Sequence, residues 1–310
     1  MAGQLILKSQ NALTDLNALP DLNYYINRVE ADGGVIYDKN SLIAAFQFIY
    51  ANNITEDQCF SALSPSWGVK YDNAATVSKL YNLYGEDGDL LLNTETSTAP
   101  KLDKTTYTFP TVYFSGSVNI FGVSKGKFNI NQNIVHASAF AIPNSVSYGA
   151  SVQFPRQVFL NKVGFEADTS PTKSLEDYMV SRELYIRDAS TNNNPATWQD
   201  SVYGYGSRYI LGGSTNLYAP FKALSTYVGK DTIDLYLNGS LLATNTVASA
   251  NIKATQLQNV NFYFGLLYDN SLTRIRYVLG HLAESWVLLD STRTVAIAIS
   301  QRIQQKYGTL

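Results

Sequence analysis

The stretch DTIDLYLNGSLLATNT, residues 231–246, decides the fold. Ile233, Leu235 and Leu237 alternate with polar residues, and a second apolar run follows Asn238-Gly239. Strict alternation is typical of a half-buried strand, and Asn-Gly supplies the two residues of positive φ that a type I′ turn requires. The stretch therefore predicts a β-hairpin.

Similar short apolar segments fill the chain from Tyr107 onward, separated by Gly, Asn, Ser and Pro. About a dozen such segments without intervening helical patterns favour an antiparallel β-sandwich over a parallel sheet. A helical pattern returns at the end, where Val295, Ile299 and Ile303 lie at four-residue steps. We expect this last helix to be capped by Asp290 or Ser291, to end at Gly308 and to pack on the sandwich.

The first ninety residues have a different pattern, with apolar stripes at helical spacing. We expect helices over Ser41–Tyr50, from Thr55 to Pro65, and from Asp72 or Asn73 to Tyr84. The stretch 93–105 (NTETSTAPKLDKT) is polar and contains a proline, and the apolar pattern changes there. The sequence thus predicts a helical region at 1–92, a linker at 93–105 and a β domain at 106–310.

Composition excludes several classes of protein. Charged residues make up 15% of the chain and the net charge is −2, which gives no sign of a nucleic-acid partner. No apolar run approaches the ~20 residues that span a bilayer, and the N-terminus lacks the apolar core of a signal peptide, so we expect cytoplasmic assembly and no membrane insertion. The single cysteine, Cys59, cannot form an intrachain disulfide, and we expect it in the core.

Two resemblances add to these patterns. The residues 231–246, then NFYFGLLYD (261–269) and GHLAESWVLLDSTRTVAIAISQRIQQKYG (280–308), resemble in order the C-terminal half of a laminin-G-like, concanavalin A-like lectin jelly roll, a likeness that extends over 107–310. YYINRVEADGGVI (24–36) and WGVKYDNAATVSKLYNLYGEDGDLLL (67–92) are similar to the start of many bacteriophage tail and virion surface proteins.

The resemblances imply a fold and a role. The fold is a mainly β protein, an antiparallel jelly-roll sandwich of concanavalin A type, preceded by a small helical region and closed by a helix. The role is that of a structural virion protein of the fibre, capsid-decoration or tail-associated adhesin type, displayed on the virion surface and assembled in the host cytoplasm. Residues 1–92 would contact other virion proteins, the protein would be a homo-oligomer with a trimer favoured, and the jelly roll would bind a host surface glycan.

A candidate ligand surface is the aromatic, glycine-rich segment 192–218 (NNNPATWQDSVYGYGSRYILGGSTNLY). Aromatic faces beside polar edges suit the C–H patches and hydroxyl rims of sugars. The candidate glycan-binding residues are Trp198, Tyr203, Tyr205, Arg208, Tyr209 and Tyr218. The same tyrosines would suit a subunit interface equally well, because tyrosine is enriched there for the same reason.

Catalytic groups are sparse. Glycosidases need two carboxylates beside the scissile bond, and the nearest pair, Glu166 and Asp168, reads as a solvent-facing strand end. His136 and His281 are interpreted as structural, since no Gly-x-Ser-x-Gly elbow accompanies them. We therefore expect no catalytic residue and no enzyme. A glycan depolymerase on the same fold, and a capsid-decoration protein that binds no ligand, remain alternatives.

Metal sites are equally weak. Glu86-Asp87-Gly88-Asp89 gathers hard oxygen ligands around a glycine, which makes Asp87 and Asp89 weak calcium candidates, and Asp269-Asn270 is a weaker case. The remaining spacing of an EF-hand loop is absent, so a solvated acidic turn is the expected alternative. Two histidines and a single cysteine argue against zinc. No other cofactor is expected.

Overall fold

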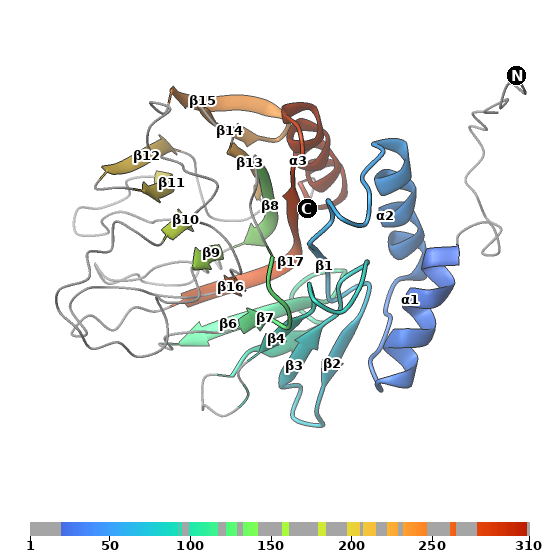
Figure 1. Ribbon diagram of the computed structural model, residues 1–310. Helices are drawn as coiled ribbons and strands as arrows, with labels where there is room; N and C mark the ends of the chain where they lie inside the picture. The colour runs from blue at the N-terminus through green and yellow to red at the C-terminus, as the bar shows by residue number, and fades with distance from the viewer. Residues whose placement is uncertain are drawn as a thin grey trace, which may run out of the picture.

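The computed structural model describes residues 20–92, 94, 99–116, 122–128, 133–141, 157–160, 179–183, 197–204, 207–214, 222–228, 232–246, 261–264 and 278–308. These residues form two antiparallel sheets and three helices (Figure 1). The helices are α1 (Pro20–Ala31), α2 (Lys39–Ala51) and α3 (Arg293–Tyr307).

The eight-stranded sheet contains, in spatial order, β15 (Ser240–Thr246), β14 (Thr232–Leu237), β13 (Lys222–Val228), β8 (Ile134–Ala141), β17 (Val278–Leu289), β6 (Thr111–Gly116) and β5 (Lys101–Asp103), with β1 (Ser61–Leu63) also paired to β17. The nine-stranded sheet contains β12 (Ser207–Ser214), β11 (Thr197–Gly204), β10 (Met179–Glu183), β9 (Gln157–Leu160), β16 (Asn261–Phe264), β7 (Gly122–Ser124), β4 (Leu90–Leu92), β3 (Val77–Leu80) and β2 (Val69–Tyr71).

The order of these strands is that of a jelly roll. The strands β6, β7, β8 and β9 alternate between the two sheets, and the late strands β16 and β17 return to lie between them, β16 between β7 and β9, and β17 between β6 and β8. Antiparallel pairing with this insertion of late strands between early ones is the winding of a double-sheet jelly roll. The predicted fold class, mainly β with a C-terminal helix, is confirmed.

The hairpin predicted over residues 231–246 is present as β14 and β15. Leu237 pairs with Ser240 across the turn, and Asn238 and Gly239 have φ values of 54° and 80°, as a type I′ turn requires. The Gly239 N–H donates a hydrogen bond of 2.9 Å to Ser300 Oγ, so the turn is held against α3.

The predicted C-terminal helix is also confirmed, as α3. Its N-cap is Thr292, rather than the predicted Asp290 or Ser291, since Thr292 Oγ1 accepts the Val295 N–H. Ile299 and Ile303 are fully buried, and Ser225 of β13 donates a 2.7 Å hydrogen bond to the Ala296 carbonyl. The stripe of α3 therefore packs on the sheet, as expected.

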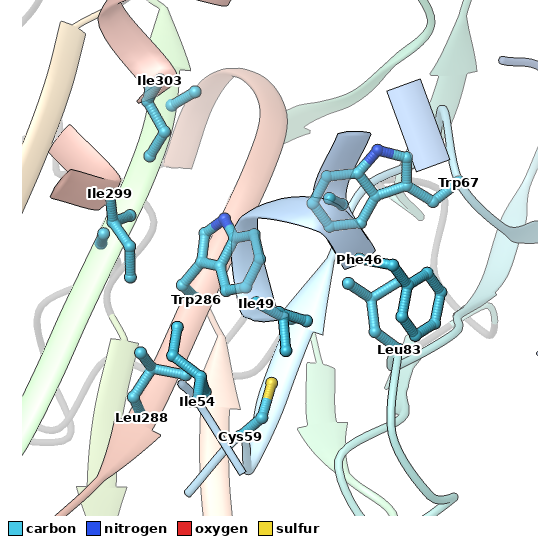
Figure 2. Packing of buried hydrophobic residues seen from close by; sticks show 14 of the residues in the cluster. Phe46, Ile49, Ile54, Cys59, Trp67, Leu83, Trp286, Leu288, Ile299 and Ile303 are labelled. Carbon is cyan, nitrogen blue, oxygen red and sulfur yellow. The ribbon is translucent and has the colours of Figure 1, made fainter. Parts of the chain in front are cut away.

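The main core lies between the eight-stranded sheet and the helices. Figure 2 shows Trp286 of β17 and Trp67 side by side, with Ile299 of α3 on one side and Phe46 of α2 on the other. The two indole rings meet edge to face, with 5.6 Å between their centroids. In Figure 1, α3, α2 and α1 follow one another away from β8 and β17. Alternate residues of β8, such as Ile134 and Phe140, are buried as well, so both faces of this sheet are covered.

Two of the predicted N-terminal helices are wrong. Residues 41–50 do form a helix, α2, which Asp38 caps by accepting the Ser41 N–H at 2.9 Å. The expected helix from Thr55 is a turn followed by β1, whose Ser61 pairs with Val287 of β17. Pairing with a distant strand overrides the local apolar pattern there.

The expected helix over 72–84 is the β2–β3 hairpin. The register between β2 and β3 shifts near Tyr71, and β3 buries Val77 and Leu80, which lie three positions apart. Such an irregularity disturbs the two-residue alternation of a strand, so the apolar residues fall at helix-like spacing.

The predicted linker is wrong for Lys101–Asp103, which form β5 and pair with β6. Strands from both sides of this stretch also share each sheet. In the eight-stranded sheet β1 pairs with β17, and in the nine-stranded sheet β4 pairs with β7. Backbone hydrogen bonding therefore joins the two predicted regions.

Candidate functional site

The predicted glycan-binding segment contains the hairpin β11–β12, with β12 at the end of the nine-stranded sheet (Figure 1). Trp198 pairs in register with Gly213, Val202 with Tyr209, and Tyr203 with Arg208. Register partners share a face and successive residues alternate, so Trp198 and Tyr209 hold positions of one face and Tyr203 and Arg208 positions of the other. Tyr205 and Tyr218 lie outside the described residues.

The strand register limits which of the candidate residues could contact the same ligand. A single flat platform made of all six candidates would need their positions on one face, and the hairpin divides four of them two and two. The Trp198 and Tyr209 positions, or the Tyr203 and Arg208 positions, can therefore meet one ligand, and the opposite pair is left for a second contact. Both the glycan and the subunit-interface interpretation remain predictions.

The two histidines lie in the eight-stranded sheet, and both are buried. His136 on β8 is 2% exposed and pairs in register with Val287, while His281 on β17 is 3% exposed. The His281 ring stacks on Tyr113 at 4.6 Å, and Tyr107 meets it edge to face at 5.1 Å. Rings so enclosed have no open face for a substrate, which agrees with the structural role that the sequence indicates.

The polar partners of His281 are Thr111 and Asp103. Its Nδ1 lies 3.0 Å from Thr111 Oγ1 and 3.7 Å from Asp103 Oδ2. Burial lowers the pKa of His281 to about 4, although the nearby Asp103 charge opposes this shift. Burial tends to raise the pKa of Asp103, but hydrogen bonds from Thr106 and Thr105 outweigh it and leave that pKa at about 2. At neutral pH the pair is thus a neutral imidazole beside an ionised carboxylate.

The calcium candidates lie on the turn before β4. Asp87 is exposed, whereas Asp89 is fully buried. Both oxygens of Asp89 lie 2.9 Å from Arg28 Nη1, and Lys79 Nζ lies 2.9 Å from Oδ2. The Asn82 N–H also donates to Oδ1 at 2.7 Å. Two cations already neutralise this carboxylate, which leaves it poorly suited to a calcium ion.

No group of three or more histidine, cysteine, aspartate or glutamate residues is arranged for a metal ion within the described ranges. The residues Glu166, Asp168, Asp269 and Asn270 lie outside those ranges. Cys59 is 1% exposed, and burial raises the pKa of its thiol, so it is a core residue rather than a nucleophile. In the same part of the chain, no helix is long and apolar enough to cross a membrane.

Sequence reasoning missed a buried charged network around Glu284 of β17. Glu284 is fully buried, and it accepts hydrogen bonds from Trp286 Nε1 at 2.6 Å and Tyr307 Oη at 2.9 Å. Arg302 and Lys306 of α3 supply the compensating charges. Burial alone would raise the pKa of Glu284, but Arg302 and Lys306 lower it. The signal was a glutamate in an apolar strand followed by basic residues four apart on a helix.

The Glu284 network anchors α3 to the sheet, and the carboxylate at its centre is closed to solvent. A register irregularity between Leu282 and Glu284 turns the glutamate to the side of the helices. The guanidinium of Arg302 also lies over the rings of Phe48, Trp67 and Trp286. A buried charge held by this many partners is expected to fix geometry, not to react with a ligand.

No known protein-family model matches the sequence, and no curated protein sequence matches it significantly. Among solved structures, the binding domain of botulinum neurotoxin DC in complex with SialylT is 9% identical, with a TM-score of 0.48 over 80% of this chain and 52% of that chain. A Trypanosoma rangeli sialidase in complex with sialic acid is 11% identical, with a TM-score of 0.46 over 79% of this chain and 33% of that chain.

A third similar structure is the CBM40 domain of a Ruminococcus gnavus sialidase bound to α2,3-sialyllactose. It is 13% identical, with a TM-score of 0.39 over 61% of this chain and 95% of that chain. The similar structures thus include carbohydrate-binding jelly-roll domains as well as glycosidases. This chain spans about half the length of the neurotoxin domain and a third of the first sialidase.

Proposed function

We propose that this protein is a non-enzymatic surface component of a bacteriophage particle, a fibre, decoration or tail-associated adhesin, whose jelly roll binds a host surface glycan. The observation that carries the proposal is the position of the aromatic, glycine-rich segment, whose described residues form the hairpin β11–β12 with β12 as the last strand of the nine-stranded sheet. A hairpin at a sheet edge can be reached by a polymer on a cell surface. The sequence resemblances to virion proteins and to lectin-like jelly rolls support the same role.

The acidic residues of the described ranges support a binding protein over a depolymerase. Glycoside hydrolysis needs one protonated and one ionised carboxylate on either side of a reachable bond. The buried carboxylates Asp89 and Glu284 are instead bound by lysine and arginine side chains. Both carboxylates are thus occupied by cationic side chains and buried away from solvent.

Attachment to the particle would use the N-terminal region. Helix α1 turns Leu22, Tyr25 and Val29 into the core and leaves Tyr24 61% exposed on its other side. A large exposed aromatic residue is a common feature of protein interfaces. We propose that this outer side of α1 contacts other virion proteins or a sister subunit, in a homo-oligomer for which a trimer is favoured.

The test of the proposal starts from the purified protein and host polysaccharide. Retention of the protein on the polysaccharide, without new reducing ends, is the expected result. New reducing ends would support a depolymerase, and neither retention nor cleavage would favour a decoration protein that binds no ligand.

Point variants then locate the contact. Trp198→Ala and Tyr203→Ala occupy positions on opposite faces of the hairpin, so at least one of them should abolish binding to host cells. Leu91→Ala is the control, because it removes an exposed apolar side chain from β4, outside the hairpin and outside α1. If the tyrosines line a subunit interface instead, light scattering will show a lower oligomer mass in the same variants. Unchanged cell binding and unchanged mass in both would contradict a role for the hairpin.

A further inference from the structure

A second aromatic surface lies where three distant segments meet. It consists of Tyr37 before α2, Tyr71 at the end of β2 and Lys104 after β5, here called the Tyr37–Tyr71–Lys104 cluster. The two hydroxyl oxygens are 2.6 Å apart, and the ring centroids are 6.4 Å apart with their planes at 26°. Lys104 Nζ lies 5.5 Å from the Tyr37 centroid and 6.0 Å from the Tyr71 centroid. Both rings are half-buried and Lys104 is exposed.

The backbone under each member of the cluster is fixed by hydrogen bonds. The Tyr37 N–H donates to the Ser66 carbonyl at 3.1 Å. Next to Tyr71, the carboxylate of Asp72 accepts the N–H groups of Ala74 and Thr76, at 2.9 and 2.8 Å.

Next to Lys104, Asp103 Oδ1 accepts the N–H groups of Thr105 and Thr106, at 2.8 and 3.0 Å. The two loops are also joined to each other, since the Leu102 N–H donates to the Ala75 carbonyl at 2.8 Å. A ligand bound to the cluster would therefore cost little in backbone ordering.

The cluster offers two hydrogen-bond donors to a negatively charged oxygen, a neutral tyrosine hydroxyl and the Lys104 ammonium group. When one tyrosine hydroxyl donates to the other, the accepting hydroxyl keeps its own hydrogen for an outside partner. Burial and the mutual hydrogen bond raise the pKa of Tyr37, so the Tyr37 hydroxyl keeps its hydrogen at physiological pH.

The ammonium group of Lys104 has no salt bridge to a carboxylate of the described residues. The neighbouring Asp103 carboxylate is engaged by Thr105 and Thr106 instead. A lysine that lies over aromatic rings, with no carboxylate partner among the described residues, can pair with an anionic group of a ligand.

We propose that the Tyr37–Tyr71–Lys104 cluster binds a carboxylated sugar residue of an acidic polysaccharide. The sugar carboxylate would lie against the Lys104 ammonium and the outward tyrosine hydroxyl, and an apolar C–H face of the ring would lie against the tyrosines. Two half-buried rings beside an exposed lysine suit one unit of an extended polymer better than a small ligand, which usually requires a concave pocket. The site does not involve the β11–β12 hairpin, and it does not depend on the function proposed above.

The test uses the full chain and two probes that share one backbone. Oligogalacturonate carries a carboxylate on every unit, and its fully methyl-esterified form carries none. Calorimetric titration should show binding of the oligogalacturonate only, with affinity that falls as salt is raised. Lys104→Gln should weaken binding about tenfold or more, as loss of a charge-assisted hydrogen bond does, whereas Lys104→Arg should retain most of it.

Two further variants separate binding from loop stability. Tyr71→Phe keeps the ring and removes the hydroxyl, so it should weaken binding by several-fold with a nearly unchanged melting temperature. Lys127→Gln removes an exposed lysine from the loop after β7 and serves as the charge-matched control, with affinity unchanged.

The proposal is overturned if wild-type protein ignores oligogalacturonate, if the methyl ester binds equally well, or if Lys104→Gln and Lys127→Gln behave alike. Equal binding of poly-L-glutamate would show a general anion site and would also overturn the assignment to a sugar. Host-cell binding by the Trp198 and Tyr203 variants is a separate measurement, so either proposal can fail without the other.

Discussion

Arg28 and Asp89, 61 positions apart in the sequence, form a salt bridge in the interior, with Arg28 Nη1 2.9 Å from each carboxylate oxygen. The side chain of Asp89 is fully buried and that of Arg28 is 9% exposed. Lys79 adds a second cation at 2.9 Å. The pair fastens α1 to the turn before β4, and it occupies the acidic turn in which the sequence suggested calcium.

The first prediction concerns this salt bridge. Arg28→Met leaves a buried carboxylate with Lys79 as its remaining cation, so we expect a loss of about 2–4 kcal/mol in the free energy of unfolding. Lys70→Met is the matched control, because Lys70 and its partner Asp32 are each 40% exposed and such surface pairs contribute below about 1 kcal/mol. Urea denaturation of both variants measures the difference. Similar losses in the two would show that burial of Asp89 does not matter.

The second prediction concerns acid pH and His281. Its pKa is about 4 in the folded protein and 6.5 when unperturbed, so between these values the unfolded chain binds a proton that the folded protein does not. Stability should therefore fall as the pH is lowered from 6.5 to 4, at up to about 1.4 kcal/mol per pH unit.

The control for this pH dependence is His281→Gln, in which the slope between pH 6.5 and 4 should be reduced. Asp103 acts in a lower window, because its pKa is about 2 instead of 3.8, so its contribution is lost only as the pH falls below 3.8. Thermal unfolding at several pH values separates the two. Equal slopes in wild type and variant would place the pH dependence on other groups.

The third prediction concerns α3. Ile299→Asp introduces a carboxylate at a fully buried position of the core shared by α3 and β8, and we expect a loss on the order of 3–5 kcal/mol. Thr294→Asp, at an exposed position of the same helix, should be close to neutral. The melting temperatures of the two variants test this directly. A melting temperature unchanged by Ile299→Asp would mean that the helix is not packed on the sheet in solution.

The parts of the fold that the sequence predicts correctly depend on local chemistry. Asn238-Gly239 sets the turn of the β14–β15 hairpin, and the four-residue spacing of Val295, Ile299 and Ile303 sets α3. The errors occur where pairing with another strand determines the secondary structure. Ser61–Leu63 becomes a strand because β17, at the far end of the chain, pairs with it. In β3 an irregular register imitates the spacing of a helix.

The candidate sites also differ in whether they depend on local sequence or on contacts between distant segments. The aromatic composition of 192–218 is a local signal, and the structure places part of it in an edge hairpin. Asp89 looked like a calcium ligand because nothing nearby in the sequence shows that Arg28 reaches it. Tyr37, Tyr71 and Lys104 come from three segments, each ordinary by itself, so only the folded chain brings them together.

The last prediction concerns the part of the chain before residue 93. A fragment of residues 106–310 would lose β1 from beside β17 and β4 from beside β7, and Trp286 would lose Trp67, whose ring lies 5.6 Å from its own. These lost contacts make up a large part of the main core. We therefore expect the fragment expressed alone to lack a cooperative unfolding transition.

Proteolysis of the full chain provides the complementary measurement. Cleavage within the polar stretch 93–98 should leave two pieces that elute together from a gel-filtration column and separate only in denaturant, because both sheets contain strands from each piece. A stable, separate fragment from about residue 106 to 310 would show instead that the strands and helices before residue 93 are dispensable to the jelly roll. In that case the N-terminal region could serve purely for attachment.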